Sequence, residues 1–222
     1  MLLVPFLVGS LLAGPTWVHL PLLVAWLGGY LLSYYLFLAL KTRRLGRVRP
    51  QVLLYAAVTV PAALVVLAVR PGLLAFAPAY AALLGVNAWF AWRKSERSLS
   101  NDVASVLLAC LMVPVAAAAA DVAPSAVLSA TVAVLLYFLG TVLYVKTMIR
   151  ERGDVRYVRA SITYHSVAIA PAAWASWWFV PLFAWLLVRA AWWPRRDLSP
   201  KQVGLVEIGH STVLVVLAVV AT

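Results

Sequence analysis

Long apolar runs separated by short polar segments fill almost the whole chain. A helix needs about 20 mainly apolar residues to cross a bilayer, and most of these runs approach that length. We therefore predict a bundle of about nine transmembrane helices in a single transmembrane domain, residues 1–222, which leaves no room for a soluble domain. The predicted spans are residues 1–14, 21–40, 51–69, 73–92, 103–120, 125–145, 160–173, 174–193 and 202–221.

Two parts of this pattern have unusual lengths. Residues 160–193 are too many for one helix and tight for two, and basic residues flank both sides. We expect either a hairpin that turns near residues 171–176 or a re-entrant first half. The first run, residues 1–14, is shorter than the hydrocarbon core of a bilayer, so we expect further residues before Met1.

The composition supports the membrane assignment. The chain is 65% hydrophobic and 11% charged, whereas a soluble domain is about half apolar and about a quarter charged. The excess apolar surface must face lipid, which excludes soluble, disordered and nucleic-acid-binding classes despite the net charge of +11. The expected fold class is an all-α integral membrane protein, and the pattern also allows two four-helix repeats plus one helix.

The basic residues indicate the topology. Of the 18 Lys and Arg residues, 17 lie in four segments that follow every second predicted helix, so all four fall on one side of the membrane. The positive-inside rule makes that side the cytoplasm. The four segments are residues 41–49, 93–97, 146–159 and 189–201.

Candidate binding residues gather toward the same side. Ionisable groups inside a membrane are rare and usually functional, although they also snorkel or pair at the interface. The functional alternative is a cavity open to the cytoplasm that binds a small anion or an anionic lipid headgroup. Its candidate contacts are Lys41, Arg97, Asp102, Lys146, Arg150, Arg152, His165 and Glu207.

Lys146 gives the sharpest expectation within this set. A buried lysine without a partner loses its proton or destabilises the fold. If Lys146 turns inward, we therefore expect a carboxylate, Glu207 or Asp102, within reach. Glu207 and His210 are three residues apart on the last predicted helix and share one of its faces.

The sequence shows no pattern for catalysis or metal binding. Cys110 is the single cysteine, so no disulfide within the chain and no cysteine cluster for a metal is possible. No nucleophile turn is visible. We assign no catalytic residue, metal site, cofactor or nucleic-acid partner, and we expect a protein that is not an enzyme, whose partner is the lipid bilayer; no oligomeric state is assigned.

One segment carries a resemblance to a known family. Residues 143–153, Leu-Tyr-Val-Lys-Thr-Met-Ile-Arg-Glu-Arg-Gly, close the sixth predicted helix. With Glu-Arg-Ser at 96–98, Asn-Asp at 101–102, Tyr-His at 164–165 and Leu-Leu-Val-Pro-Phe-Leu-Val-Gly at 2–9, the chain resembles the YwiC-like family of bacterial membrane proteins over essentially its whole length. The resemblance implies a multi-pass protein of the bacterial cytoplasmic (inner) membrane and brings no established activity.

A weaker similarity concerns topology. Lys41-Thr42 and Lys146-Thr147 end two predicted helices that are four helices apart. A repeated four-helix unit of this kind is similar to the UbiA-type prenyltransferases. That family holds Mg²⁺ with paired Asp-rich motifs, and the first Lys-Thr pair here has no carboxylate beside it.

Three functional hypotheses follow from the sequence. The first is a carrier with a cytoplasm-facing pocket for an anionic small molecule or lipid headgroup. The second is an intramembrane lipid-modifying enzyme of UbiA-like architecture. The third is an accessory subunit or assembly factor of a membrane complex.

Overall fold

The computed structural model describes residues 1–221, and every regular element within them is helical. The prediction of an all-α protein is therefore confirmed. The α-helices are α1 (Leu3–Ala13), α2 (His19–Thr42), α3 (Leu45–Val69), α4 (Ala77–Trp92), α5 (Leu99–Cys110), α6 (Met112–Ala119), α7 (Leu128–Val145), α8 (Val155–Ala175), α9 (Val180–Trp192) and α10 (Pro200–Val220).

Helices α5 and α6 form one bent rod, because only Leu111 separates them. Pro114 lacks the N–H that would bond to the carbonyl of Cys110, so the helical hydrogen-bond ladder breaks at this point. Residues 1–221 thus form nine helical rods, of which six are long and apolar enough to cross a membrane.

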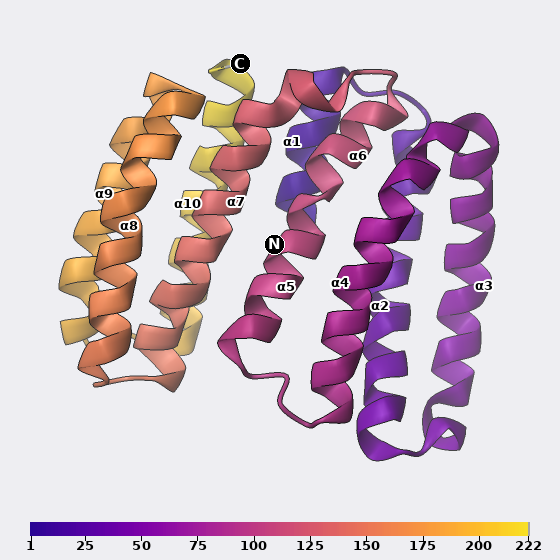
Figure 1. Ribbon diagram of the computed structural model, residues 1–222, viewed down its shortest axis with the longest axis horizontal. Coiled ribbons are helices and arrows are strands. Elements are labelled where there is room, and N and C mark those ends of the chain that lie inside the picture. The colour runs from indigo at the N-terminus through magenta and orange to yellow at the C-terminus, as the bar shows by residue number, and fades with distance from the viewer. Residues whose placement is uncertain (222) are drawn as a thin grey trace.

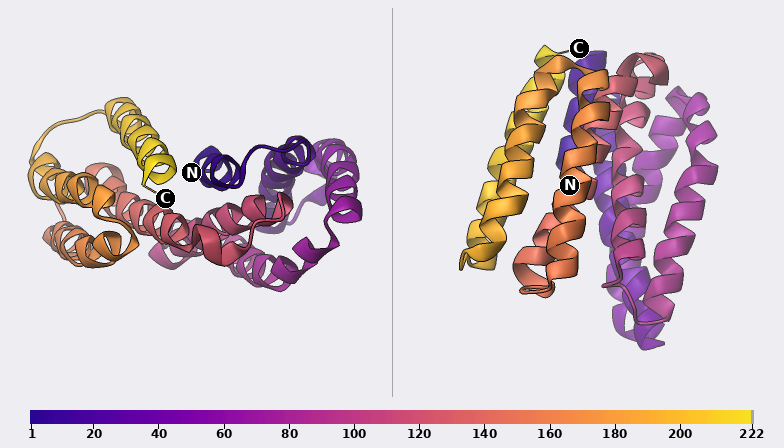
Figure 2. Two further views of the ribbon diagram at one scale, coloured as in Figure 1. Left: turned by 90° about the horizontal axis from the view of Figure 1, so that it is seen from above. Right: turned by 60° about the vertical axis from the view of Figure 1, so that its left-hand side comes forward.

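The rods run roughly parallel to one another and give the molecule two lobes (Figure 1). Helices α2, α3 and α4 form one lobe, and α7 to α10 form the other. Seen from above, α1 lies between the lobes on the side of α10, opposite the row of α5, α6 and α7 (Figure 2). The N terminus of the chain lies near the middle of the bundle's height. Helix α1 therefore occupies the space between the lobes only in the half that contains the C terminus.

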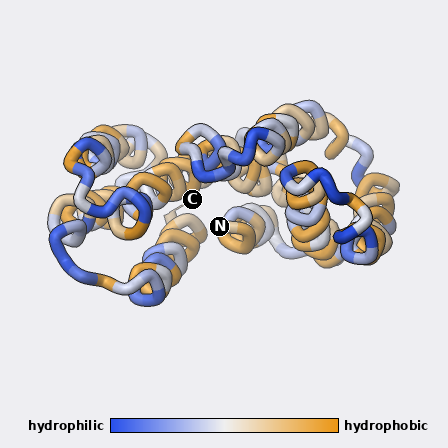
Figure 3. The backbone as a smooth tube through the Cα atoms, turned by 90° about the horizontal axis from the view of Figure 1, so that it is seen from below, coloured by the Kyte–Doolittle hydropathy of each residue, from blue (hydrophilic) through white to orange (hydrophobic). Residues whose placement is uncertain are grey.

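All four basic segments lie at the same end of the bundle, which we call the basic end (Figure 3). The loops after α2, α4, α7 and α9 meet there, as Figure 1 also shows. At the opposite end, Arg70 pairs with Asp121 at 2.6 Å. His19 is buried there and bonds through Nε2 to the carbonyl of Ala116 at 2.9 Å, so it ties α2 to α6.

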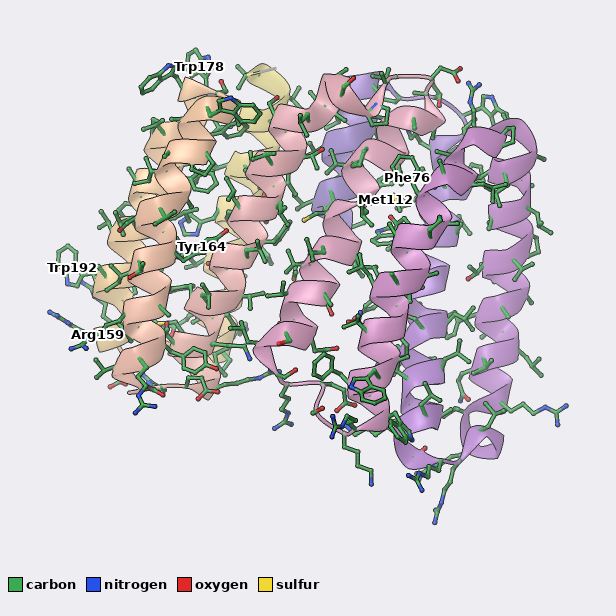
Figure 4. The ribbon with its side chains drawn as sticks, in the orientation of Figure 1. Phe76, Met112, Arg159, Tyr164, Trp178 and Trp192 are labelled. Atoms are coloured by element: carbon green, nitrogen blue, oxygen red, sulfur yellow. The ribbon has the colours of Figure 1, made fainter. Side chains whose placement is uncertain are left out.

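Residues 155–192 form a helical hairpin. α8 ends at Ala175, Ser176 is extended, and the chain returns through a short 3₁₀ turn (Trp177–Phe179) into α9. Trp178 projects from the turn and Trp192 projects nearer the basic end, where Arg159 also lies (Figure 4). Exposed tryptophans at two levels of a helix pair are typical of the two membrane interfaces.

The interior of the described residues holds two large apolar clusters and a small third one formed by Tyr144, Met148 and Val203. The larger one joins α7, α8, α9 and α10 with parts of α1 and α5, and Phe183 and Leu214 are among its fully buried members. The second joins α1, α2 and α6, with Met112 at its centre and Phe76 packed against it (Figure 4). The two lobes therefore have separate cores that meet along α1 and the α5–α6 rod.

Candidate functional site

The end of α7 changes from an α-helix to a wider turn. Residues Lys146–Arg150 form a π-helical turn, and the N–H of Glu151 donates to the carbonyl of Lys146 at 2.8 Å. Such turns insert an extra residue into the helix and are frequent at functional sites. Here the turn brings Lys146 and Thr147 into the interior, where both are almost fully buried.

Lys146 points inward and has two partners. Its ammonium lies 2.8 Å from the carboxylate of Asp102 on α5, and it donates to the backbone carbonyl of Arg97 at 2.9 Å. The lysine side chain is 4% exposed. The expectation that a buried Lys146 has a carboxylate partner is confirmed, and the partner is Asp102.

A second lysine reaches the same stretch of chain from the other lobe. Lys41, in the last turn of α2, lies 2.9 Å from Oε1 and 3.1 Å from Oε2 of Glu96. Burial acts to raise the pKa of Glu96, but its hydrogen bond to Lys41 and the positive charges of Lys41 and Arg97 outweigh burial and hold that pKa below its usual range. The carboxylate is therefore ionised at neutral pH.

Residues 96–102 are thus held at both ends by lysines from different helices. Ser98 caps α5 by accepting from the N–H of Asn101 at 3.3 Å. The Asn101 side chain donates to the carbonyl of Glu96 at 2.8 Å, while its own Oδ1 is buried without a partner. We call the four charged residues Lys41, Glu96, Asp102 and Lys146 the lysine clamp.

The larger of two internal cavities lies on the Lys41 side of this clamp. It has a volume of about 520 Å³ and lies between α2, α4 and α5. Lys41, Glu96 and Asn101 contribute charged and amide groups, and Asn87 and Ser105 add polar groups deeper inside. The remaining lining is mainly aliphatic and aromatic, and comprises Met1, Leu2, Tyr30, Ser33, Tyr34, Phe37, Leu38, Leu84, Ala91, Leu108 and Ala109.

The smaller cavity lies on the Lys146 side. It measures about 310 Å³ and is lined by Asp102, Lys146, Arg150 and Thr141, with aliphatic side chains around them. Met1 lines both cavities. The clamp therefore separates two hollows in the basic half of the bundle.

A second buried charge cluster lies between α7, α9 and α10. Arg189 is fully buried, its Nη1 contacts Oε1 of Glu207, and its guanidinium lies over the Tyr144 ring at 3.9 Å. The other carboxylate oxygen, Oε2, accepts from Thr141 at 2.9 Å and from Tyr137 at 3.2 Å. Because Thr141 also lines the smaller cavity, this cluster adjoins the clamp.

His210 completes that cluster at its edge. Its Nδ1 lies 3.2 Å from Nη1 of Arg189 and 3.8 Å from Glu207, as expected for residues that share a helix face. The indole N–H of Trp185 donates to Nε2 at 2.8 Å. These contacts indicate a structural tie between α7, α9 and α10, in which Nε and Nη2 of Arg189 are buried without a hydrogen-bond partner.

Three other residues expected from the sequence contribute no side-chain contact to the clamp. Arg97 contributes its backbone carbonyl rather than its guanidinium, and Arg152 pairs with Asp197 at the surface. His165 is buried on α8, where Nδ1 lies 2.7 Å from the carbonyl of Ser161. Its ring packs so closely on Gly140 that an added Cβ there would lie 2.9 Å from Nε2.

Sequence reasoning did not include Glu96 and Arg189 among the binding candidates. Glu96 looked like part of a solvated basic loop, and only the distance to Lys41 shows its role. Arg189 lies one turn before two tryptophans at a helix end, where snorkelling is the usual behaviour of an arginine. The sequence feature that could have indicated a buried Arg189 is Glu207. A carboxylate within an apolar run needs a cation as its partner.

Comparison with known proteins places the chain in a family. The family model described as "YwiC-like protein" matches residues 1–117. An uncharacterized protein of Haemophilus influenzae is 36% identical over 225 residues, which cover 100% of this chain and 94% of the relative. The uncharacterized protein YwiC of Bacillus subtilis is 32% identical over 218 residues, which cover 94% of this chain and 88% of the relative.

No solved structure matches the chain significantly. The motif at residues 143–153 lies beyond the stretch that the family model matches, but the alignment with the Haemophilus protein spans the whole chain. The apolar helices and the bacterial relatives agree with the resemblance noted from the motifs. The chain therefore belongs to the YwiC-like family of bacterial membrane proteins.

Proposed function

We propose that this protein is a carrier of the bacterial cytoplasmic membrane that binds an anionic group on an apolar body in the larger clamp cavity. In this proposal all nine rods lie in the membrane, with α1 covering only part of its thickness, and the basic end faces the cytoplasm, as the positive-inside rule requires. The anionic group belongs to a small molecule or a lipid headgroup. The observation that carries the proposal is the cavity itself.

The cavity has the size and lining of a ligand site. Its volume of about 520 Å³ falls within the usual range for small-molecule pockets, about 300–1,000 Å³. Such pockets combine mostly apolar walls with a few placed polar groups. Here Tyr30, Tyr34 and Phe37 offer an aromatic wall, and Lys41 and Asn101 supply polar groups toward the basic end.

The polar groups favour an anion that also carries a hydrogen-bond donor. An ammonium has three donors, and both contacts of Lys41 are to one carboxylate, which leaves donor capacity for a ligand oxygen. Asn101 Oδ1 is buried and has no partner. A hydroxyl or amine of the ligand would satisfy that oxygen and remove the free-energy cost of leaving it unpaired.

A tight helix–helix seam lies on the far side of the cavity from the basic end. Toward the opposite end, α1 packs directly on α6, and a Cβ added at Gly9 would lie 2.3 Å from the carbonyl of Val113. Val113, Ala116 and Ala117 are fully buried in this contact region. In the proposed carrier, transport would require this tight seam to open.

The prenyltransferase-like alternative has less support. It needs carboxylates that converge on one cleft to hold a metal and a diphosphate. Glu96, Asp102 and Glu207 are each ion-paired with a different cation. Within residues 1–221, no group of three or more His, Cys, Asp or Glu side chains is placed to hold a metal ion.

Binding is tested with hexyl phosphate on the purified protein in detergent, with hexanol and hexyltrimethylammonium as probes of altered charge. We expect hexyl phosphate alone to raise the melting temperature, and Lys41→Gln to abolish this shift. Lys94→Gln is the matched control, because Lys94 is exposed in the neighbouring loop and lines neither cavity. Equal shifts in Lys41→Gln and wild type would refute the site.

Transport is tested separately with the same protein reconstituted into proteoliposomes. A carrier should take up labelled hexyl phosphate, and Lys41→Gln should remove most of the uptake. Specific binding without uptake would refute the carrier function while leaving the binding cavity in place.

A further inference from the structure

An apolar groove runs along the outer side of α2 and α4 and adjoins the larger clamp cavity, with which it shares Ser33, Phe37 and Leu84. It has a volume of about 880 Å³ and opens on the outside of the bundle. Leu36, Leu40, Leu84 and Ala88 form much of its wall. Gly85 also lines it, and a Cβ added there would meet no heavy atom within 4 Å, so the groove has room at this point.

The groove ends in basic residues. Arg43, which follows the last turn of α2, lines both the groove and an adjoining hollow of about 340 Å³. Arg93, which follows the last turn of α4, lines the same hollow together with Trp89 and Trp92. The Arg93 guanidinium lies 5.3 Å from the centre of the Trp89 ring, which holds it at this position.

These two arginines differ from the two lysines of the clamp. Lys41 and Lys146 each have a carboxylate partner. In the part of the chain that the structure describes, Arg43 and Arg93 form no ion pair with a carboxylate. Two positive charges therefore flank a polar hollow at the end of an apolar groove.

We infer that this groove is a binding site for an anionic phospholipid, with an acyl chain along α2 and α4 and the phosphate between Arg43 and Arg93. Guanidinium groups bind phosphate through paired hydrogen bonds, and basic pockets between helices at a membrane surface recognise anionic headgroups. Trp89 and Trp92 are both about half exposed, which suits tryptophans at the headgroup level. The inference does not depend on the carrier function.

A phospholipid fits these features better than a soluble anion does. The groove wall is almost entirely hydrocarbon, and a soluble anion would use only the hollow beside the arginines. Acyl chains of any lipid can fill an apolar groove inside a membrane. In this proposal the two arginines determine which lipid headgroup is retained.

The charge test uses protein reconstituted in bilayers of equal parts phosphatidylglycerol and phosphatidylcholine. After mild detergent extraction, the lipids that stay bound are counted by native mass spectrometry. We expect the wild type to retain phosphatidylglycerol preferentially. Each arginine near the surface contributes a preference of about fivefold, so Arg43→Gln with Arg93→Gln should remove most of the selectivity. Arg47→Gln with Arg49→Gln is the control, since these exposed residues line neither hollow.

A second variant tests the groove rather than the charges. Gly85→Leu places a side chain in the groove without a backbone clash and should lower the retention of both lipids. Gly209→Leu is the matched control. Gly209 is an exposed glycine on α10 where an added Cβ meets no heavy atom within 4 Å, and it does not line the groove. Equal retention in these two glycine variants, or unchanged selectivity in the double arginine variant, would overturn the inference.

Discussion

The Lys146 ammonium lies 2.8 Å from the carboxylate of Asp102, and this contact joins α5 to the π-helical turn that follows α7. The lysine side chain is 4% exposed and the aspartate side chain 23%. At such low exposure, each charge is tolerated because the other is present. The pair therefore fixes the relative position of two helices at the boundary between the two cavities.

Replacing Lys146 with Met should destabilise the protein, because it leaves the Asp102 carboxylate partly buried without its cation. We expect a loss of about 2 kcal/mol in the free energy of unfolding, below the about 3–5 kcal/mol seen for fully buried pairs. Adding Asp102→Asn to Lys146→Met should restore much of this loss. Thermal denaturation in detergent measures the effect, and additive losses in the double variant would contradict the pairing.

The Lys41–Glu96 pair should weaken in acid. The pKa of Glu96 is lowered in the folded state, so its stabilising contribution is present above the unfolded-state pKa and is lost as pH falls through the folded-state value. Both side chains are partly exposed, 42% and 32%, so the contribution is at most about 1 kcal/mol. Comparing wild type with Glu96→Gln should therefore show a stability difference at about pH 7 that shrinks as pH falls through the lowered folded-state pKa of Glu96. A difference that grows in acid would contradict this assignment.

The position of each polar residue along the length of its helix could be predicted from the sequence. It follows from the number of residues between that position and the nearest basic segment. That reasoning anticipated that the four basic segments lie at one end and that a buried Lys146 would have a carboxylate partner. It rested on run lengths and on the cost of an unpaired buried charge, and both are properties of the chain alone.

The rotation of each helix about its axis could not be predicted. Membrane helices are apolar on nearly all sides, so periodicity gives little indication of which face turns inward. For this reason the partner of Lys146 stayed open between Asp102 and Glu207. The structure pairs Lys146 with Asp102 because α5 packs on α7, while Arg189 of α9 occupies Glu207. Both cavities also depend on side-chain packing that the sequence pattern does not specify.

The orientation in the membrane can be tested by thiol labelling in intact cells. Cys110 is buried, so the native protein should not react with membrane-impermeant reagents. A cysteine at exposed Ser125, beyond α6, should label from outside, whereas one at exposed Arg156, at the start of α8, should label only after permeabilisation. The positive-inside rule is the reason for this expectation. Labelling at position 156 in intact cells would reverse the orientation and place the lysine clamp on the outer side.

The Arg189–Glu207 contact should matter more for stability than any other ion pair in the described part of the chain, residues 1–221. Arg189 is fully buried and the Glu207 side chain is 13% exposed. An arginine cannot shed its charge by losing a proton, so removing the carboxylate leaves an uncompensated cation in the interior.

We therefore expect Glu207→Gln to cost about 3 kcal/mol or more in the free energy of unfolding. Combining it with Arg189→Met removes both charges and should recover most of that loss. Trp185→Phe serves as the local control, because it removes the hydrogen bond to His210 while keeping an aromatic ring and both charges, and it should cost about 1 kcal/mol. Thermal denaturation of the four proteins in one detergent measures all three effects. If Glu207→Gln melts no lower than Trp185→Phe, the buried charge pair does not hold α9 and α10 together.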